Sequence, residues 1–174
     1  MKYIYLVVGK SGSGKSTLVK FFCKNHNCKE VISYTTRAKR YEGEDTHIFI
    51  TDNEFDELKD LCAYTKFSHS RYGATSQQVD ESDFYIVDPN GVSYFYDHYT
   101  GQKEPVVIYI ECSAIRRFFR MLKRKDKLPK IFERLINDKK EFKDFEKKAD
   151  YVVKNNNKRK AIRDLKNLIF WTKK

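Results

Sequence analysis

The sequence lacks an apolar run long enough to span a membrane, and it lacks a paired cysteine motif. Its longest apolar stretches, residues 3–9 and 106–112, have the length of a strand, whereas a spanning helix needs about 20 apolar residues. The N-terminus runs into a glycine-rich motif instead of a signal-peptide cleavage site. Internal repeats and low-complexity linkers are absent. We therefore expect a cytoplasmic globular protein with no membrane partner.

The cysteines form no C-x-x-C pair, which favours reduced structural thiols over a disulfide or a metal site at Cys23, Cys28, Cys62 and Cys112.

Positive charge exceeds negative charge along the chain. Among 174 residues, 35 are Lys or Arg and 24 are Asp or Glu, which gives a net charge of +11 and points to an anionic ligand. A hydrophobic content of 40%, with 15% aromatic residues, excludes a disordered chain, and the length suits one domain. Recognition-helix, RNP and zinc patterns are absent, and 25 of the basic residues are lysines scattered along the chain. A nucleic-acid partner is therefore disfavoured.

Apolar patterns typical of strands alternate with patterns typical of helices. Residues 2–9 form a nearly continuous apolar run, as in a strand buried on both faces of a parallel sheet. Pro129 should break or restart a helical stretch over 114–148. The alternation predicts an α/β fold. Further strands are expected within 31–37, 47–50, 83–88, 106–112 and 149–155, and further helices at 15–25, at 158–171, and from Thr51 or Asp52 onward with Phe55, Leu58 and Leu61 on one face.

A phosphate-binding motif lies between the first expected strand and the first expected helix. Residues 9–17 satisfy G-x-x-x-x-G-K-[ST], and this strand–loop–helix context separates a P-loop from a chance match. Lys15 should reach the β- and γ-phosphates of ATP, and the Ser16 hydroxyl should ligate Mg²⁺. Glycines let backbone N–H groups turn toward an anion at the N-terminus of a helix. We expect ATP to contact Gly9, Ser11, Gly12, Ser13, Gly14, Lys15, Ser16 and Thr17.

A second group of phosphate-binding side chains follows the P-loop. The segment 33–37 and Arg40 place two guanidinium groups three residues apart, near several hydroxyls. Such groups are suited to a second phosphate, which they would bind by paired hydrogen bonds. A surface charge cluster is the alternative.

The order of these motifs resembles the guanylate kinase family. GKSGSGKSTL is followed by VISYTTRAKR, and the similarity continues through EGEDTHIF, NEFDEL, FSHSRYGAT, VDPNGV, ERLINDKKEF and ADYVVKN. The resemblance implies a single domain over 1–174 with the three-layer P-loop NTPase fold, a parallel central sheet, a small lobe that binds the nucleoside monophosphate and a helical lid. It places the core in 1–32, 80–115 and 136–174, the monophosphate-binding lobe in 33–79 and the lid in 116–135.

The resemblance also assigns residues to the acceptor nucleotide. It implies that Ser33, Arg37, Arg40 and Tyr72 hold the phosphate of the nucleoside monophosphate. His47 stands where the family usually has a tyrosine that reaches this phosphate, although an ordinary edge-strand residue is the alternative. Asp88 resembles the acidic residue that ends the corresponding strand and faces both the P-loop and the acceptor site. We expect the strand within 83–88 to end at the turn DPNG, and an aspartate that caps this turn is the alternative for Asp88.

Residues 115–135 resemble the mobile lid of the family but lack its usual R-G-T signature. The resemblance makes Arg120, Arg124 and Arg134 the candidates, beside Lys15, for the charges that close on the transferring phosphoryl group. Asn155 resembles a residue near the adenine end of the ATP site. A solvated helix face is the favoured interpretation of Arg116, Arg117 and Lys123.

Three positions depart from the family at the base-reading end of the acceptor site. Ala63 and Ala74 stand where the family has groups that read guanine, and Ile86 stands where an acidic residue is frequent. The resemblance implies Mg²⁺- and ATP-dependent phosphorylation of a nucleoside monophosphate, GMP or dGMP giving GDP or dGDP. Two alternatives stay open: a related kinase with another base preference, and a non-catalytic guanylate kinase-like binding module.

Overall fold

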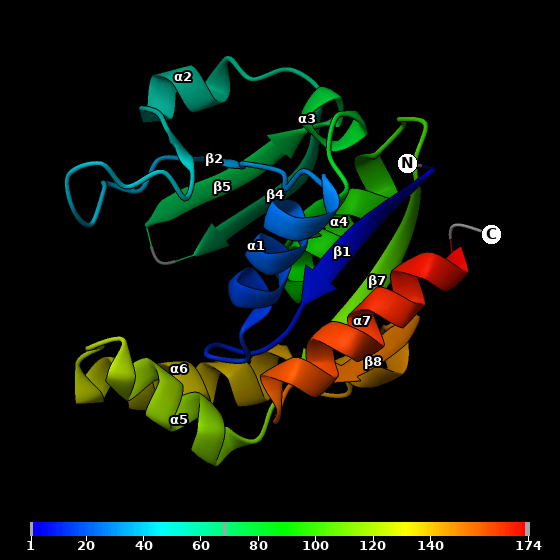
Figure 1. Cartoon of the computed structure of the whole chain (residues 1–174). Coiled ribbons are helices and arrows are strands. Elements are labelled where there is room, and N and C mark those ends of the chain that lie inside the picture. Colours follow the sequence, from blue (N-terminus) through cyan, green and yellow to red (C-terminus); the bar gives the residue numbers. More distant parts are fainter. Residues whose placement is uncertain (1, 68, 173–174) are drawn as a thin grey trace.

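A computed structural model of the chain describes residues 2–67 and 69–172 (Figure 1). Its central sheet has the strand order β6-β1-β7-β8, and all neighbouring strands are parallel. The predicted α/β fold with a parallel central sheet is confirmed. The strands are β1 (Tyr3–Val8), β6 (Phe84–Ile86), β7 (Glu104–Glu111) and β8 (Tyr151–Lys154).

Helices cover both faces of the central sheet, which makes three layers. Side chains alternate along β1, so Ile4 and Leu6 enter one core while Tyr5 and Val7 enter the other. The first core is closed by α4 (Pro89–His98) and the segment after α6 (Leu128–Glu141). The second core is closed by α1 (Lys15–His26) and α7 (Lys158–Thr172). The P-loop lies between β1 and α1, at the carboxyl edge of the sheet.

A second sheet stands apart from the central one, with the strand order β3-β2-β5-β4 (Figure 1). Its strands β4 and β5 form an antiparallel hairpin, and β2 pairs antiparallel with β5 and parallel with β3. The sheet lies within the expected lobe 33–79. Its strands are β2 (Tyr34–Thr35), β3 (Ile48–Phe49), β4 (Leu61–Phe67) and β5 (Ser70–Thr75), and the helices α2 (Asp52–Asp56) and α3 (Ser76–Asp80) connect to them.

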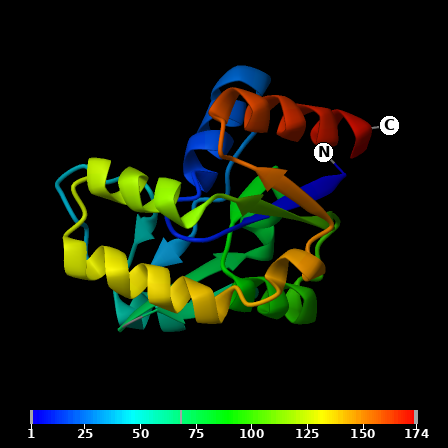
Figure 2. The same cartoon turned by 90° about the horizontal axis from the view of Figure 1, so that it is seen from below.

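Two helices, α5 (Ala114–Lys123) and α6, run side by side below the P-loop (Figure 2). Pro129 lies in the first turn of α6, where its missing N–H leaves no helical hydrogen bond unmade, so the predicted restart of the helix is confirmed. The expected lid boundary at residue 135 falls inside α6. A 3₁₀ helix (Phe145–Lys148) leads to β8. No helix among the described residues is long and apolar enough to cross a membrane.

Two expectations from the sequence pattern are wrong. The helix that starts after Thr51 ends at Asp56, and Leu61 opens β4 because Asp60 turns the chain with a left-handed φ of 59°. The segment after Asp88 is a helix rather than only a turn, since Pro89 occupies the first turn of α4.

Candidate active site

Two P-loop glycines allow the loop to pack closely against other segments. Gly12 has φ 74°, and a Cβ there would lie 2.8 Å from the Arg117 carbonyl oxygen of α5. Gly14 has φ 94°, and a Cβ there would lie 2.5 Å from Asn155 Nδ2. Asn155 Nδ2 itself donates to the Ser13 carbonyl oxygen at 2.7 Å. The loop therefore fits against α5 and the end of β8 only with glycine at these two positions.

A cavity of about 450 Å³ lies between the P-loop and residues of α5 and α6. Three buried polar atoms near it have no hydrogen-bond partner among the described residues: Ser13 Oγ, Arg134 Nε and Asn155 Oδ1. Buried polar atoms are normally paired, so unpaired ones around a basic cavity suit a polar anionic ligand. We call this the donor cavity; it is lined by Ser11, Gly12, Gly14, Lys15, Ser16, Thr17, Arg120, Met121, Arg124, Arg134, Asn155 and Lys158.

A second cavity, of about 270 Å³, lies between the two sheets. It shares Ser11 and Lys15 with the donor cavity. The structure thus brings four of the six expected acceptor residues to one place, and Gly9 of the P-loop lines it too. We call it the acceptor cavity; its other lining residues are Ser33, His47, Thr65, Phe67, Tyr72, Tyr85, Ile86, Val87, Asp88, Asp138, Glu141 and Phe142.

Arg37 and Arg40 lie outside the acceptor cavity. The Arg37 guanidinium binds the buried Glu44 carboxylate through Nη2 at 2.8 Å and Nη1 at 3.2 Å, and Arg40 donates its backbone N–H to the same group at 2.7 Å. These hydrogen bonds, that of Arg37 first, hold the pKa of Glu44 at about 2. Glu44 therefore occupies the bidentate donor pair that the sequence assigned to a phosphate.

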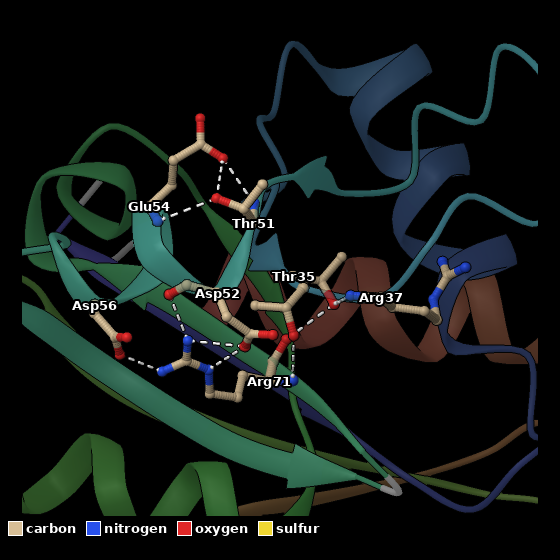
Figure 3. Close-up of polar contacts among 8 residues, drawn as sticks. Thr35, Arg37, Thr51, Asp52, Glu54, Asp56 and Arg71 are labelled. Atoms are coloured by element: carbon tan, nitrogen blue, oxygen red, sulfur yellow. Dashed lines mark hydrogen bonds and ion pairs between the residues drawn. The ribbon is translucent and has the colours of Figure 1, made fainter.

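Hydrogen bonds fix the segment after β2 that carries Arg37. Thr35 Oγ1 accepts the Arg37 backbone N–H at 3.2 Å and donates to the Arg71 carbonyl oxygen at 2.9 Å. Arg71 in turn binds Asp52 and Asp56, while the Arg37 side chain extends away from this acidic pair (Figure 3). The charge of Arg71 is thus neutralised by Asp52 and Asp56, and the Arg37 side chain does not reach these two carboxylates.

His47 lies beside Ser33 and Tyr72 at the wall of the acceptor cavity. Ser33 Oγ and His47 Nδ1 are 3.0 Å apart, and the rings of His47 and Tyr72 meet edge to face. Burial, reinforced by the Arg37 charge, lowers the pKa of His47. The neutral imidazole is therefore favoured in the free protein.

The three base-end departures have different surroundings. Ala63 and Ala74 face each other across β4 and β5, and both are buried in the first core. Ile86 lines the acceptor cavity. The polar side chain that β4 offers to the acceptor cavity is Thr65, two residues after Ala63 and opposite Tyr72. No sequence motif marked Thr65 as a site residue.

Lys15 lies where the two cavities meet, among acidic side chains. Its ammonium donates to the Gly9 carbonyl oxygen. Burial lowers the pKa of Lys15 to about 8, and the charges of Asp138, Glu141 and Asp88 oppose this shift. Burial together with Asp88 and Asp138 raises the pKa of Glu141 to about 7.

Asp138 and Arg117 form a buried ion pair that holds the P-loop. Arg117 Nη1 lies 2.6 Å from Asp138 Oδ2 and donates also to the Ser11 carbonyl oxygen at 3.2 Å. Asp138 accepts the Ser11 backbone N–H at 3.0 Å and the Ser11 hydroxyl at 3.1 Å. Arg117 is 5% exposed, so the expectation that it lies on a solvated helix face is wrong.

The three arginines expected to close on phosphate all line the donor cavity, but each has different partners. Arg120 donates to the carbonyl oxygens of Ser13 and Asn155, at 2.9 and 2.8 Å. Arg124 binds Asp126 and is half exposed. Burial, with the nearby Arg124 charge, lowers the pKa of Arg134. Arg120 is thus held by the loop, whereas Arg124 and Arg134 retain donors for a ligand.

Asp138 and Glu141 also belong to the site, although no sequence motif marked them. A signal for them existed, because Arg134, Asp138 and Glu141 recur at helical spacing and therefore share one face of α6. The pattern could not reveal that this face meets the P-loop.

Comparison with known proteins identifies the family. The guanylate kinase family model matches residues 1–172. Curated guanylate kinases of Schizosaccharomyces pombe and Pseudoalteromonas translucida are 37% and 31% identical over 84 residues. These matches cover 44% of this chain and only 41% and 40% of the relatives.

The structural comparison agrees with the family model. The crystal structure of guanylate kinase from Anaplasma phagocytophilum matches with a TM-score of 0.66, 19% identity, and coverage of 99% of this chain and 87% of that one. This likeness shows the shared fold, and the family model spans nearly the whole sequence. The chain belongs to the guanylate kinase family.

Proposed function

We propose that the protein transfers the γ-phosphoryl group of ATP to a nucleoside monophosphate, GMP or dGMP, giving GDP or dGDP. The observation that carries the proposal is that the donor and acceptor cavities share Ser11 and Lys15. A phosphoryl group bound by Lys15 would therefore face both nucleotides. Phosphoryl transfer depends mainly on such positioning and on neutralisation of charge.

Donor binding falls to the P-loop and the residues around it. Backbone N–H groups at the start of α1 face the phosphates, and Gly9, Ser13 and Thr17 complete the loop. Arg124 and Arg134, with Arg120, neutralise the charge on the transferring group beside Lys15. Asn155 contacts the adenine end. A binding module would not need Lys15 and Ser16, so the intact loop favours catalysis.

The chain fits a magnesium ion bound chiefly through nucleotide. Ser16 is exposed and lines the donor cavity, and no cluster of three acidic, His or Cys side chains suited to a metal exists among the described residues. Mg²⁺ usually takes one or two protein oxygens and completes its shell with phosphate and water. Ser16 would hold it, and the ion would supply charge neutralisation at the phosphates.

Acceptor binding falls to the second sheet. Ser33, His47 and Tyr72 bind the phosphate of the monophosphate, and Asp88 faces both nucleotides. Arg37 joins them by exchanging Glu44 for the phosphate, and Arg40 adds its charge. In this proposal residues 33–79 form the acceptor lobe and 116–135 the mobile part of the lid, and the enzyme works in the cytoplasm.

The test is ADP formation with Mg²⁺, ATP and a panel of ribo- and deoxyribonucleoside monophosphates. We expect GMP or dGMP to be the preferred acceptor and Lys15→Ala to abolish the signal. Lys10→Ala is the matched control, because Lys10 lies in the same loop but lines neither cavity. ADP formation that no acceptor stimulates, or that survives Lys15→Ala, would refute the proposal.

A further inference from the structure

The α5–α6 hairpin carries large apolar side chains on its solvent side. Ile115 is 71% exposed, Phe119 61% and Ile136 59%. Phe118 and Phe132 touch at the seam between the helices, with ring centroids 6.0 Å apart, so the two apolar stripes form one continuous surface. We call this surface the outer hairpin face; it consists of Ile115, Phe119, Leu122, Leu128, Phe132 and Ile136.

This face points away from the donor and acceptor cavities. Helix α5 turns Arg117, Arg120 and Met121 toward the P-loop, and helical spacing puts Ile115, Phe119 and Leu122 on other sides of the helix. None of the six residues lines the donor or acceptor cavity. Figure 2 shows the two helices at the front of the view from below, with no helix or strand of the described residues over them. Movement of the α5–α6 hairpin toward bound nucleotides would therefore leave the outer hairpin face exposed.

Nearly all the exposed charges around the face are positive. Among residues 114–141, all described, the exposed charged side chains are basic except Glu133. The basic ones gather at the turn between the helices and beside the apolar stripes: Arg116, Lys123, Arg124, Lys125, Lys127, Lys130, Lys139 and Lys140.

We propose that the outer hairpin face docks the enzyme on an anionic phospholipid surface. A bilayer offers both negative headgroups and an apolar interior, and amphipathic helices with Phe and Leu on one side and Lys and Arg on the other bind in this way. A second copy would bring like charges together. Nucleic acid would satisfy the charges but offers no apolar phase to Ile115 or Leu122.

The test measures sedimentation of the full chain with phosphatidylcholine vesicles, with and without phosphatidylserine. We expect binding only to the anionic vesicles. The double variant Phe119→Gln/Leu122→Gln should weaken it by about tenfold or more. The matched control is Tyr96→Gln/Phe170→Gln, at positions 55% and 56% exposed on α4 and α7, and it should bind like wild type. Lys123→Gln/Lys130→Gln and added salt should also weaken binding.

Four outcomes would overturn the proposal. They are no binding to anionic vesicles, undiminished binding of Phe119→Gln/Leu122→Gln, self-association in sedimentation equilibrium that this variant abolishes, and DNA binding at least as tight as vesicle binding. Kinase activity measured without vesicles should be equal in wild type and Ile115→Gln/Ile136→Gln, which alters the outer hairpin face outside residues 116–135, so failure of the docking proposal leaves the proposed reaction untouched.

Discussion

Two opposing effects act on the pKa of Lys15. Burial disfavours its charge, while Asp138, Glu141 and Asp88 favour it and Arg117 opposes them, and the result is a pKa of about 8. Lys15 must be protonated to bind phosphate. We therefore expect kcat/KM for ATP, which reports the free enzyme, to fall as pH rises through 8.

A matched variant identifies the group responsible for that alkaline limb. Asp138→Asn removes the largest charge that sustains Lys15, so the limb should move to lower pH. Glu146→Gln serves as control, since Glu146 lies on the 3₁₀ helix and lines neither cavity. An alkaline limb at the same pH in Asp138→Asn would contradict this account.

Glu141 should make the stability of the fold depend on pH. Its pKa rises from an ordinary value of 4.5 to about 7, so between these values the folded state holds a proton that the unfolded state has lost. The resulting contribution is complete below pH 4.5 and disappears as pH rises through 7. Urea titrations should therefore show that Glu141→Gln flattens the decline in unfolding free energy over this range. An equal slope in wild type and variant would exclude the effect.

The Arg117–Asp138 pair should respond asymmetrically to substitution. Arg117→Leu leaves a buried carboxylate without its main partner, which costs about 3–5 kcal/mol of unfolding free energy. Arg117→Leu/Asp138→Leu removes both charges and should recover most of the loss. The free energy of unfolding of both variants is measured by urea titration. Equal destabilisation of the single and the double variant would argue against an uncompensated buried charge.

Spacing predicted the P-loop residues, because that motif is local. It did not predict the Arg117–Asp138 pair, since a basic helix in isolation does not reveal which of its faces is buried. The Glu44 carboxylate that holds Arg37 was missed for a similar reason. A loop brings it back to the arginine, and no periodic pattern encodes that return.

At the scale of elements, Asp88 joins a strand end, a helix start and the site. Its carboxylate accepts the Gly91 backbone N–H at 2.7 Å, which makes it the N-cap of α4, and it also lines the acceptor cavity. The capping alternative and the site assignment are therefore compatible in one residue.

Substitution of Asp88 separates its two roles. Asp88→Ala should lower the unfolding free energy by about 1 kcal/mol through loss of the cap, whereas Asp88→Asn retains a good cap and should be nearly as stable as wild type. Both should reduce transfer to GMP if the carboxylate acts at the site. Full activity in Asp88→Asn would limit this residue to capping.

Elements with a clear apolar pattern were predictable, including the short strands β2, β3, β6 and β8, whereas the β4–β5 hairpin and the helices α3 and α4 were not. The strand β1 and the helices α1 and α7 carry enough apolar positions to fix their type. The hairpin of β4 and β5 is held by pairing across the second sheet, and Gly73 lets Phe55 and Leu61 approach it closely. That packing depends on contacts between segments, so local patterns did not reveal it.

At the scale of the molecule, the net charge of +11 has three uses in this account. A few charges lie at the two cavities, the hairpin carries a concentrated basic surface, and the remainder forms a field that steers anionic nucleotides inward. We expect kcat/KM for ATP and GMP to fall with rising salt, because ions screen exposed charges beyond about 10 Å at 0.1 M. The measurement is kcat/KM at increasing salt and fixed pH, and kcat at saturating substrate is measured in the same series for comparison. A salt-independent kcat/KM would exclude steering.

The central claim is that Lys15 presents one phosphoryl group to two nucleotides. Its most direct test follows the label of γ-labelled ATP when GMP is the acceptor. We predict that the label appears in GDP, in amounts equal to the ADP formed, and that Lys15→Ala abolishes this product while Lys10→Ala retains it. Label recovered only as inorganic phosphate, or in GDP made equally by Lys15→Ala, would contradict the account.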